Sequence, residues 1–139
     1  MNILVIDAQG GGIGRQLITK LLERIPEADI VAAGTNSMAT NAMIKAGAKK
    51  AATGENAIRY CASQAEIITG PIGILVANAM LGEISPAIAE SVGSSTAPKV
   101  LIPTAHCNTI ISGTKALSVK DSIEDAVERI VRIYGSEDN

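Results

Sequence analysis

Residues 3–22 read ILVIDAQGGGIGRQLITKLL, in which four apolar residues lead through Asp7 into a run of glycines. The continuous apolar run 2–7 is typical of a strand buried on both faces of a parallel sheet. After the glycines, the apolar positions fall at helical spacing and the charged positions lie on the other side of the wheel. A strand, a glycine-rich turn and an amphipathic helix in this order predict the first unit of an α/β fold.

The rest of the chain continues this alternation of strand and helix. We therefore predict a single-domain, doubly wound, Rossmann-like and mainly parallel sheet of five or six strands flanked by helices. The domain is expected to cover residues 1–135, with 136–139 as a frayed tail. Predicted strands cover 2–7, 29–35, 49–53, 65–70 and 99–104, and predicted helices cover 13–25, 37–46, 55–64, 85–93 and 118–134.

Residues 72–83 and 108–113 carry less regular patterns than the other predicted strands and helices, whereas the pattern of the last helix, 118–134, is clear. The composition of residues 72–83, IGILVANAMLGE, favours a buried helix over a strand, and residues 108–113 are a candidate sixth strand. In the last helix, Ser118 and Asp121 resemble a capping box. Its predicted buried stripe consists of Val119, Ile123, Val127, Ile130 and Tyr134, and Gly135 is expected to end it.

Composition limits the classes of protein. The 139 residues are 47% apolar but include no Phe or Trp, so one aliphatic core is expected. The 12 basic and 14 acidic residues form no long block of one sign, which argues against a nucleic-acid partner. The longest mainly apolar run, 72–81, is about half the length of a membrane-spanning helix, so no membrane segment is expected.

The cellular compartment is predicted from the start of the chain and from the cysteines. The opening residues MNILVID lack the charged and apolar regions of a secretory signal, so we expect a cytoplasmic protein. Cys61 and Cys107 form no CxxC pair and are expected to be free thiols.

The glycine run is a candidate anion site. Backbone N–H groups without side chains at the positive end of a helix dipole favour a phosphate. The candidate ligand-binding residues there are Gly10, Gly11, Gly12, Ile13 and Gly14. The alternative is that the glycines only let the first helix pack closely on the sheet.

The dinucleotide fingerprint GxGxxG is not met, because Arg15 stands where its third glycine is expected. The stretch IDAQGGGIGR instead resembles the cofactor loop of short-chain dehydrogenases. In that resemblance Gly12, Ile13 and Gly14 match the Gly-Ile-Gly of the loop, Arg15 matches a position that is often basic, and Ala8 departs from its first glycine.

Other features of those dehydrogenases are missing. The carboxylate expected about 20 residues after the glycines, which binds the ribose, is replaced by the run Gly34 to Ser37. The Tyr-x-x-x-Lys pair is also absent, since Gln64 follows Tyr60 and Asp138 follows Tyr134 at that spacing. The resemblance therefore implies a ligand loop, with NAD(P) or another nucleotide as a possible cofactor, and no oxidoreductase activity.

Further candidates follow the other strands, because the carboxyl ends of parallel strands meet at one edge where ligands bind. The candidate ligand-binding residues in these loops are Thr35, Asn36, Ser37, Gly70, Pro71, Ile72 and Gly73. Glu55 and Asn56 are either further hydrogen-bonding groups for a ligand or helix caps.

The catalytic candidates are Cys107, His106 and Asp7. A neighbouring His can lower the pKa of a thiol, but packing or pocket lining is the other interpretation of this pair. No third or fourth ligand is spaced to complete a zinc site with them, so no metal is predicted. Asp7 is expected to point away from a phosphate, to accept N–H bonds from the loop, or to hold a metal or a hydroxyl group.

Six motifs in order, VIDAQGGGIGRQL, GTNS, ATGENA, GPIGI, GEISPA and IPTAHCN, resemble a family of small bacterial Rossmann-like proteins known as a domain of unknown function. The resemblance covers nearly the whole chain. It implies a stand-alone protein and no particular activity.

Three functional hypotheses remain. The first is binding of a nucleotide or other phosphate-bearing metabolite at the glycine loop. The second is a small enzyme that uses Cys107 or His106 on that ligand, and the third is a regulatory or assembly module with a purely structural loop. A homodimer is also expected, through the alanine- and methionine-rich segments 37–46 or 72–81.

Overall fold

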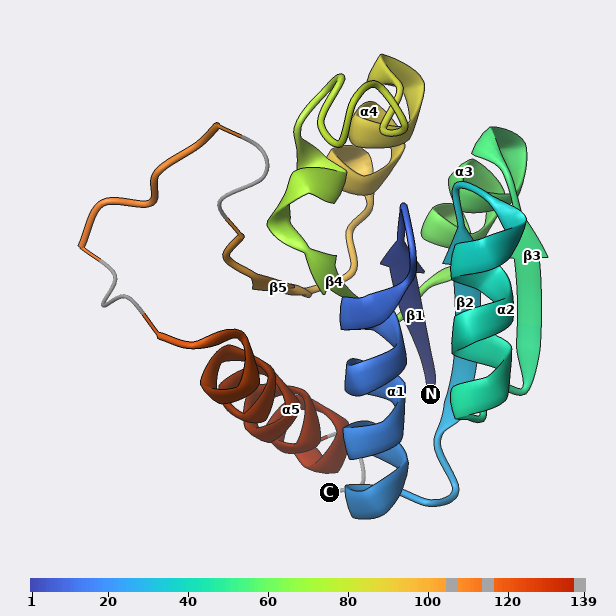
Figure 1. The fold of residues 1–139 in the computed structure, drawn as a ribbon. Helices are drawn as coiled ribbons and strands as arrows, with labels where there is room; N and C mark the ends of the chain where they lie inside the picture. The colour runs from blue at the N-terminus through green and yellow to red at the C-terminus, as the bar shows by residue number, and fades with distance from the viewer. Residues whose placement is uncertain (105–107, 114–116, 137–139) are drawn as a thin grey trace.

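The structure is a computed structural model and describes residues 1–104, 108–113 and 117–136. These residues form one parallel sheet of five strands in the order β3-β2-β1-β4-β5, with helices on both faces (Figure 1). The predicted α/β, doubly wound class is confirmed. The strands are β1 Asn2–Asp7, β2 Asp29–Gly34, β3 Lys50–Thr53, β4 Ile67–Pro71 and β5 Lys99–Ile102.

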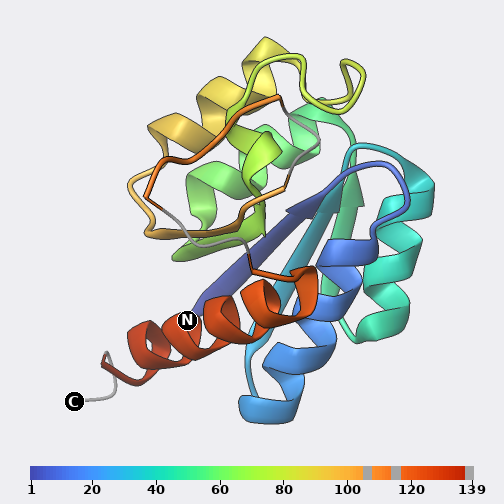
Figure 2. The ribbon, with the colours of Figure 1, turned by 60° about the vertical axis from the view of Figure 1, so that its left-hand side comes forward.

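Helices cover both faces of the sheet (Figures 1 and 2). Helix α1 packs against α2 and α5 on one face, and α3 packs against α4 on the other. The helices are α1 Gly12–Arg24, α2 Ser37–Ala46, α3 Glu55–Gln64, α4 Pro86–Ser94 and α5 Val119–Ser136, and a 3₁₀ turn, η1, covers Ile72–Leu75.

The core consists of two aliphatic clusters separated by the sheet. Because successive side chains of a strand point to opposite faces, β1 contributes Ile3 and Val5 to one cluster and Leu4 and Ile6 to the other. The first cluster also contains side chains of α1, α2 and α5, and the second contains those of α3 and α4. The central position of β1 explains its uninterrupted apolar sequence.

The register of the strands determines which loops share an edge. Asp7, the last residue of β1, lies opposite Gly34 of β2, and Gly34 lies opposite Thr53 of β3. Strand β1 also pairs with β4 on its other side. Strands β2 and β3 are added on one side of β1 and strands β4 and β5 on the other, so the strand order switches between β1 and β4. In folds of this kind, ligands bind beyond the carboxyl ends of the strands near this switch point.

Residues 72–83 are not the helix predicted from their composition. Only Ile72–Leu75 are helical, as the short 3₁₀ turn η1, and tight turns follow. Asn78, Met80 and Leu81 have φ angles of 67°, 56° and 58°, which a right-handed helix does not allow. Ala79 and Ile84 are buried and anchor the segment in the second core cluster.

The candidate sixth strand is also wrong, because the described residues 108–113 contain no strand. Ile110 in this segment is 95% exposed. The apolar residues there indicated a strand, but no neighbouring strand of the sheet pairs with them.

Helix α5 largely follows its prediction. The Asp121 N–H donates to Ser118 Oγ at 3.1 Å, as in a capping box, and Ile123, Val127 and Ile130 are buried. Val119, predicted to be buried, is 47% exposed because it begins the helix beyond the edge of the core. The helix also continues through Gly135 to Ser136 instead of ending at the glycine.

Within the described ranges, no helix is both long enough and apolar enough to cross a membrane.

Candidate functional site

Asp7 lies at the base of the glycine loop, where β1 leads into α1. Its Oδ1 accepts the Ala8 N–H at 2.8 Å and its Oδ2 accepts the Gly14 N–H at 2.7 Å. The side chain is only 4% exposed. Of the alternatives for Asp7, the structure shows the acceptance of loop N–H groups. The carboxylate therefore ties the loop to the first turn of α1.

The pKa of Asp7 is raised above its ordinary value, mainly by burial, although the N–H groups of Gly14, Ala8 and Ile13 act to lower it. The negative charge of Glu83 also raises the pKa. Asp7 thus places a carboxyl group under the positive end of α1, where an anion is stabilised by the helix dipole.

Two glycines of the loop are required by the fold itself. Gly11 has a φ of 73°, and a Cβ on it would lie 2.8 Å from the Ala39 backbone oxygen. A Cβ on Gly14 would lie 2.6 Å from Met43 Sδ and 3.1 Å from Asp7 Cβ. These two positions allow α1 and α2 to pack closely, as the structural interpretation of the glycines predicts.

Gly10 and Gly12 have no such structural reason. A Cβ on either residue would meet nothing within 4 Å, and neither residue has φ in the left-handed region. Both are exposed, and no acceptor for their N–H groups is found in the part of the chain that the structure describes. They therefore present unshielded backbone donors to solvent.

The end of β2 meets the glycine loop directly. The Thr35 N–H donates to the Asp7 backbone oxygen at 3.1 Å, and Asn36 Nδ2 donates to the Gln9 backbone oxygen at 3.0 Å. Asn36 Oδ1 accepts the Ala39 N–H at 2.9 Å and so caps α2. Ser37 is exposed at the start of α2.

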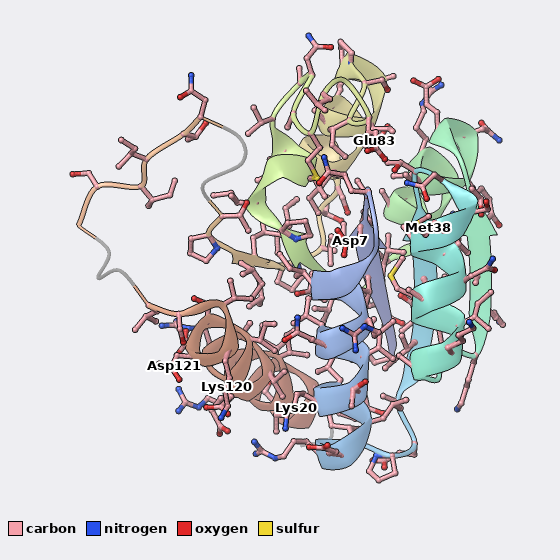
Figure 3. All side chains as sticks on the ribbon, viewed as in Figure 1. Asp7, Lys20, Met38, Glu83, Lys120 and Asp121 are labelled. Carbon is pink, nitrogen blue, oxygen red and sulfur yellow. The ribbon has the colours of Figure 1, made fainter. Side chains whose placement is uncertain are left out.

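Glu83 completes this cluster, although the sequence patterns did not identify it. Its Oε1 accepts three hydrogen bonds: from Gln9 N at 3.0 Å, Thr35 Oγ1 at 2.7 Å and Asn36 Nδ2 at 2.9 Å. Figure 3 shows Glu83 above the carboxyl end of β1, on the same side of the sheet edge as Asp7. The structure therefore unites the loop after β1, the loop after β2 and the segment before α4.

Burial acts to raise the pKa of Glu83, but the hydrogen bonds from Gln9, Thr35 and Asn36 together outweigh it and lower the pKa. The side chain is accordingly an ionised acceptor at neutral pH. Gly82, directly before Glu83, favours a turn over a helix, but no local pattern indicates that the Glu83 carboxylate reaches the glycine loop.

The candidates at 70–73 lie next to this cluster but are mostly buried. Gly70, Pro71 and Gly73 are buried, and Ile72 is half-buried. A Cβ on Gly70 would lie 2.2 Å from the Ile6 backbone oxygen, so this glycine is required where β4 approaches β1. Its role in the fold is structural.

The remaining candidate residues either lie away from the glycine loop or fall outside the described residues. Glu55 accepts a hydrogen bond from Ser85 Oγ, which links the start of α3 to the start of α4, and Asn56 is exposed. His106 and Cys107 lie outside the described residues. Cys61 is half-buried on α3, and burial raises the pKa of its thiol. No group of three or more His, Cys, Asp or Glu residues suited to a metal occurs among the residues described.

The two basic residues that follow the glycine loop in sequence, Arg15 and Lys20, line a small cleft of about 120 Å³ between α1 and α5, together with Lys120. In Figure 3, Lys20 and Lys120 lie below the edge that carries Asp7 and Glu83. The exposed polar groups of Gly10 and Gly12 at the glycine loop are those of the backbone.

A larger open groove of about 1020 Å³ lies between β5, α5 and the segment before α5. Its walls include Ile110, Ile111 and Leu117, together with Asp125 and Arg129. The last two pair with each other at 2.8 Å. The groove is lined by both apolar and polar side chains. We place the candidate site instead at the glycine loop, where exposed glycines lie beside the loop after β2 and the Glu83 side chain.

Comparisons with known proteins agree with this fold. Residues 2–135 match the family described as "Domain of unknown function (DUF3842)", and the chain belongs to that family. No curated protein sequence matches the chain. Among solved structures, the chain is similar to the crystal structure of a dodecameric FMN-dependent Ubix-like decarboxylase from Escherichia coli O157:H7. The TM-score is 0.51 and the identity 16%, over 97% of this chain and 95% of the other.

Proposed function

We propose that this member of the DUF3842 family binds a nucleotide or another phosphate-bearing metabolite at its glycine loop. The observation that carries the proposal is the difference among the loop glycines. Gly11 and Gly14 are explained by packing and backbone conformation, whereas Gly10 and Gly12 are exposed and unconstrained by the fold. Absence of side chains at these two positions favours close approach of an external group to the backbone.

The charges at the site limit where a phosphate lies. Two unit charges 4 Å apart interact by about 1 kcal/mol in water and by about 4 kcal/mol near a protein surface. Asp7 is buried beneath the loop and accepts the N–H groups of Ala8 and Gly14, whereas Gly10 and Gly12 are exposed. We expect the phosphate on the exposed side of these two residues.

The fold neighbour supports the choice of ligand class. Its description as FMN-dependent names a phosphate-bearing cofactor. FMN therefore belongs among the ligands to be tested, together with NAD, NADP, ATP, GTP and coenzyme A. The ligand-binding residues proposed in the other loops are Thr35, Asn36, Ser37, Pro71, Ile72 and Gly73, whereas Gly70 is explained by its closeness to the Ile6 backbone.

We also propose a cytoplasmic homodimer. Leu81 and Met38 support self-association, because they are 99% and 69% exposed on the two segments expected to form the interface. The neighbour's dodecameric assembly shows that this fold can oligomerise in another protein. Light scattering tests the proposal, and a monomer would refute it.

The alternative of a small enzyme depends on His106 and Cys107 and stays a prediction. Faster alkylation of Cys107 than of an ordinary exposed thiol would favour it. The alternative of a regulatory or assembly module would be favoured by a stable heteromeric partner and no retained small molecule.

Calorimetry against the ligand panel tests the proposed function. We expect at least one ligand to bind the wild-type chain, and Gly12→Asp to abolish binding through a carboxylate at the N–H donors. Gly135→Asp is the matched control, because its Cβ also meets nothing within 4 Å and lies on α5. Absence of binding by every ligand, or equal affinity in Gly12→Asp, would overturn the proposal. Native mass spectrometry of the freshly purified protein would identify a retained metabolite.

A further inference from the structure

The carboxylate that nucleotide-binding folds of this kind carry at the end of the second strand is absent from that strand here. Residues 34–37 read GTNS and include no acid. The tertiary structure nevertheless brings a carboxylate to this position, since Thr35 Oγ1 and Asn36 Nδ2 both donate to Glu83 Oε1. Glu83 is 48 residues from Thr35 in sequence.

The two carboxylate oxygens of Glu83 differ in the hydrogen bonds that they accept from the described residues. Oε1 accepts all three hydrogen bonds, from Gln9, Thr35 and Asn36. Over the ranges 1–104, 108–113 and 117–136, no donor to Oε2 is found. An ionised carboxylate has about four acceptor positions, so Oε2 keeps its capacity for a hydroxyl donor.

We propose that Glu83 accepts a ribose hydroxyl of the bound ligand, and that the ligand is therefore a ribonucleotide. This inference rests on the proposed function, because it requires a phosphate at the glycine loop. In dinucleotide-binding folds the pyrophosphate lies at the start of the first helix, and an acid at the end of the second strand accepts the ribose 2′-hydroxyl. Gln9 N joins Glu83 to the glycine loop and so places the two subsites side by side.

The segment that carries Glu83 is shaped to hold it there. The Asn78 N–H donates to the Ile84 backbone oxygen at 2.7 Å, and the Ile84 N–H donates to the Ala79 backbone oxygen at 3.2 Å. Ala79 and Ile84 are buried on either side of Glu83, while Leu81 at the tip is 99% exposed. Both anchors keep the carboxylate at the sheet edge.

The same placement predicts a preference among ligands. A fixed negative charge at the ribose attracts free hydroxyls and repels a 2′-phosphate. NADP-like ligands are consequently disfavoured relative to their counterparts with a free 2′-hydroxyl.

Isothermal titration with matched ligands tests the assignment. The probes are the four ribonucleoside 5′-monophosphates, their 2′,3′-dideoxy counterparts and inorganic pyrophosphate. In the wild-type protein we expect at least one ribonucleotide to bind about tenfold or more tightly than its dideoxy counterpart, the effect of losing a hydrogen bond to a charged group. Pyrophosphate reports on the glycine loop alone.

Glu83→Gln is the informative variant. Its amide oxygen can still accept from Gln9, Thr35 and Asn36, while the free acceptor becomes an NH₂ donor. We expect it to lose the difference between ribo and dideoxy ligands and to keep its affinity for pyrophosphate. Glu90→Gln on α4 removes an exposed charge of the same kind and is expected to retain the wild-type preference.

The possible failures are distinguishable. If neither pyrophosphate nor any nucleotide binds, the proposed function fails, and the ribose assignment fails with it. If phosphate ligands bind equally with and without ribose hydroxyls, only the assignment of Glu83 is overturned. If Glu83→Gln instead binds pyrophosphate more tightly, the carboxylate competes with the anion, and the assignment is likewise overturned.

Discussion

Oε1 of Glu83 lies 2.9 Å from Nδ2 of Asn36, although 47 residues separate the two in sequence. Asn36 follows β2 and caps α2, whereas Glu83 belongs to the turns that follow η1. This contact joins the half of the sheet that contains β2 to the segment that leads into α4. It also gives the candidate site a carboxylate that no local sequence motif provides.

The loop glycines are expected to differ in their effects on stability. Gly11→Ala places a Cβ against Ala39 and requires a left-handed backbone, which should lower the free energy of unfolding by about 2 kcal/mol or more. Gly12→Ala adds a Cβ in open space at the start of α1 and should change it by about 0.5 kcal/mol or less. Urea denaturation measures both, and equal effects would contradict the division of the glycines into two classes.

Asn36 is expected to be the most sensitive polar residue at the end of β2. Asn36→Ala removes the cap of α2 and the bonds to Gln9 and Glu83, and should lower the free energy of unfolding by about 2 kcal/mol. Asn41→Ala, an exposed position on the same helix, is the matched control with an expected change within about 0.5 kcal/mol. Similar losses in the two variants would show that the contacts of Asn36 contribute little.

Stability should depend on pH through Glu83. Because its folded-state pKa lies below the ordinary value of 4.5, its contribution is present above that value and is lost as the pH falls through the lowered pKa. The stability of the wild type relative to Glu83→Gln should therefore decrease on acidification below pH 4.5. Urea denaturation of both proteins across the acidic range measures this difference.

Asp7, which the wild type and Glu83→Gln both contain, has the opposite effect on the pH dependence of stability. Its raised pKa means that its contribution is present below the ordinary value of 3.8 and is lost as the pH rises through the raised value. The comparison between wild type and Glu83→Gln largely cancels this effect. A difference in stability that stays constant with pH would refute the stabilisation of ionised Glu83.

The segment that carries Glu83 should depend on its buried anchor and tolerate change at its tip. Ile84→Ala removes a fully buried side chain and should lower the free energy of unfolding by about 2–5 kcal/mol. Leu81→Ser changes a side chain that is 99% exposed and should alter monomer stability by about 0.5 kcal/mol or less. Thermal or urea unfolding compares the two, and a large loss in Leu81→Ser would place that residue in a contact, including one in a homodimer.

Most of the fold was predictable because its signals are local. The apolar run 2–7, the helical spacing after Ile13 and the Ser85–Pro86 start of α4 each specify an element within a few residues. The predicted helix at 72–83 failed for a physical reason. Its apolar residues are compatible with a helix, but Asn78, Met80 and Leu81 adopt positive φ so that Ala79 and Ile84 reach the core.

The candidate site was predictable only in part. Gly10, Gly12, Thr35 and Asn36 follow from the rule that loops after parallel strands share an edge. Gly70 matched the same rule, yet its closeness to the Ile6 backbone gives it a structural role. Nothing local distinguishes these two kinds of glycine, because the difference depends on which atoms of other strands and helices lie nearby.

The sequence by itself determined the alternation of strands and helices outside 72–83 and 108–113, the aliphatic character of the core and the presence of a glycine loop before α1. These properties depend on side-chain periodicity and backbone preference over short distances. Only the tertiary structure decided that Asp7 turns its carboxylate to the N–H groups of Ala8 and Gly14, and that Glu83 meets Thr35 and Asn36. Such contacts depend on the pairing of the strands and on the packing of the buried anchors of the turns, so no short stretch of sequence encodes them.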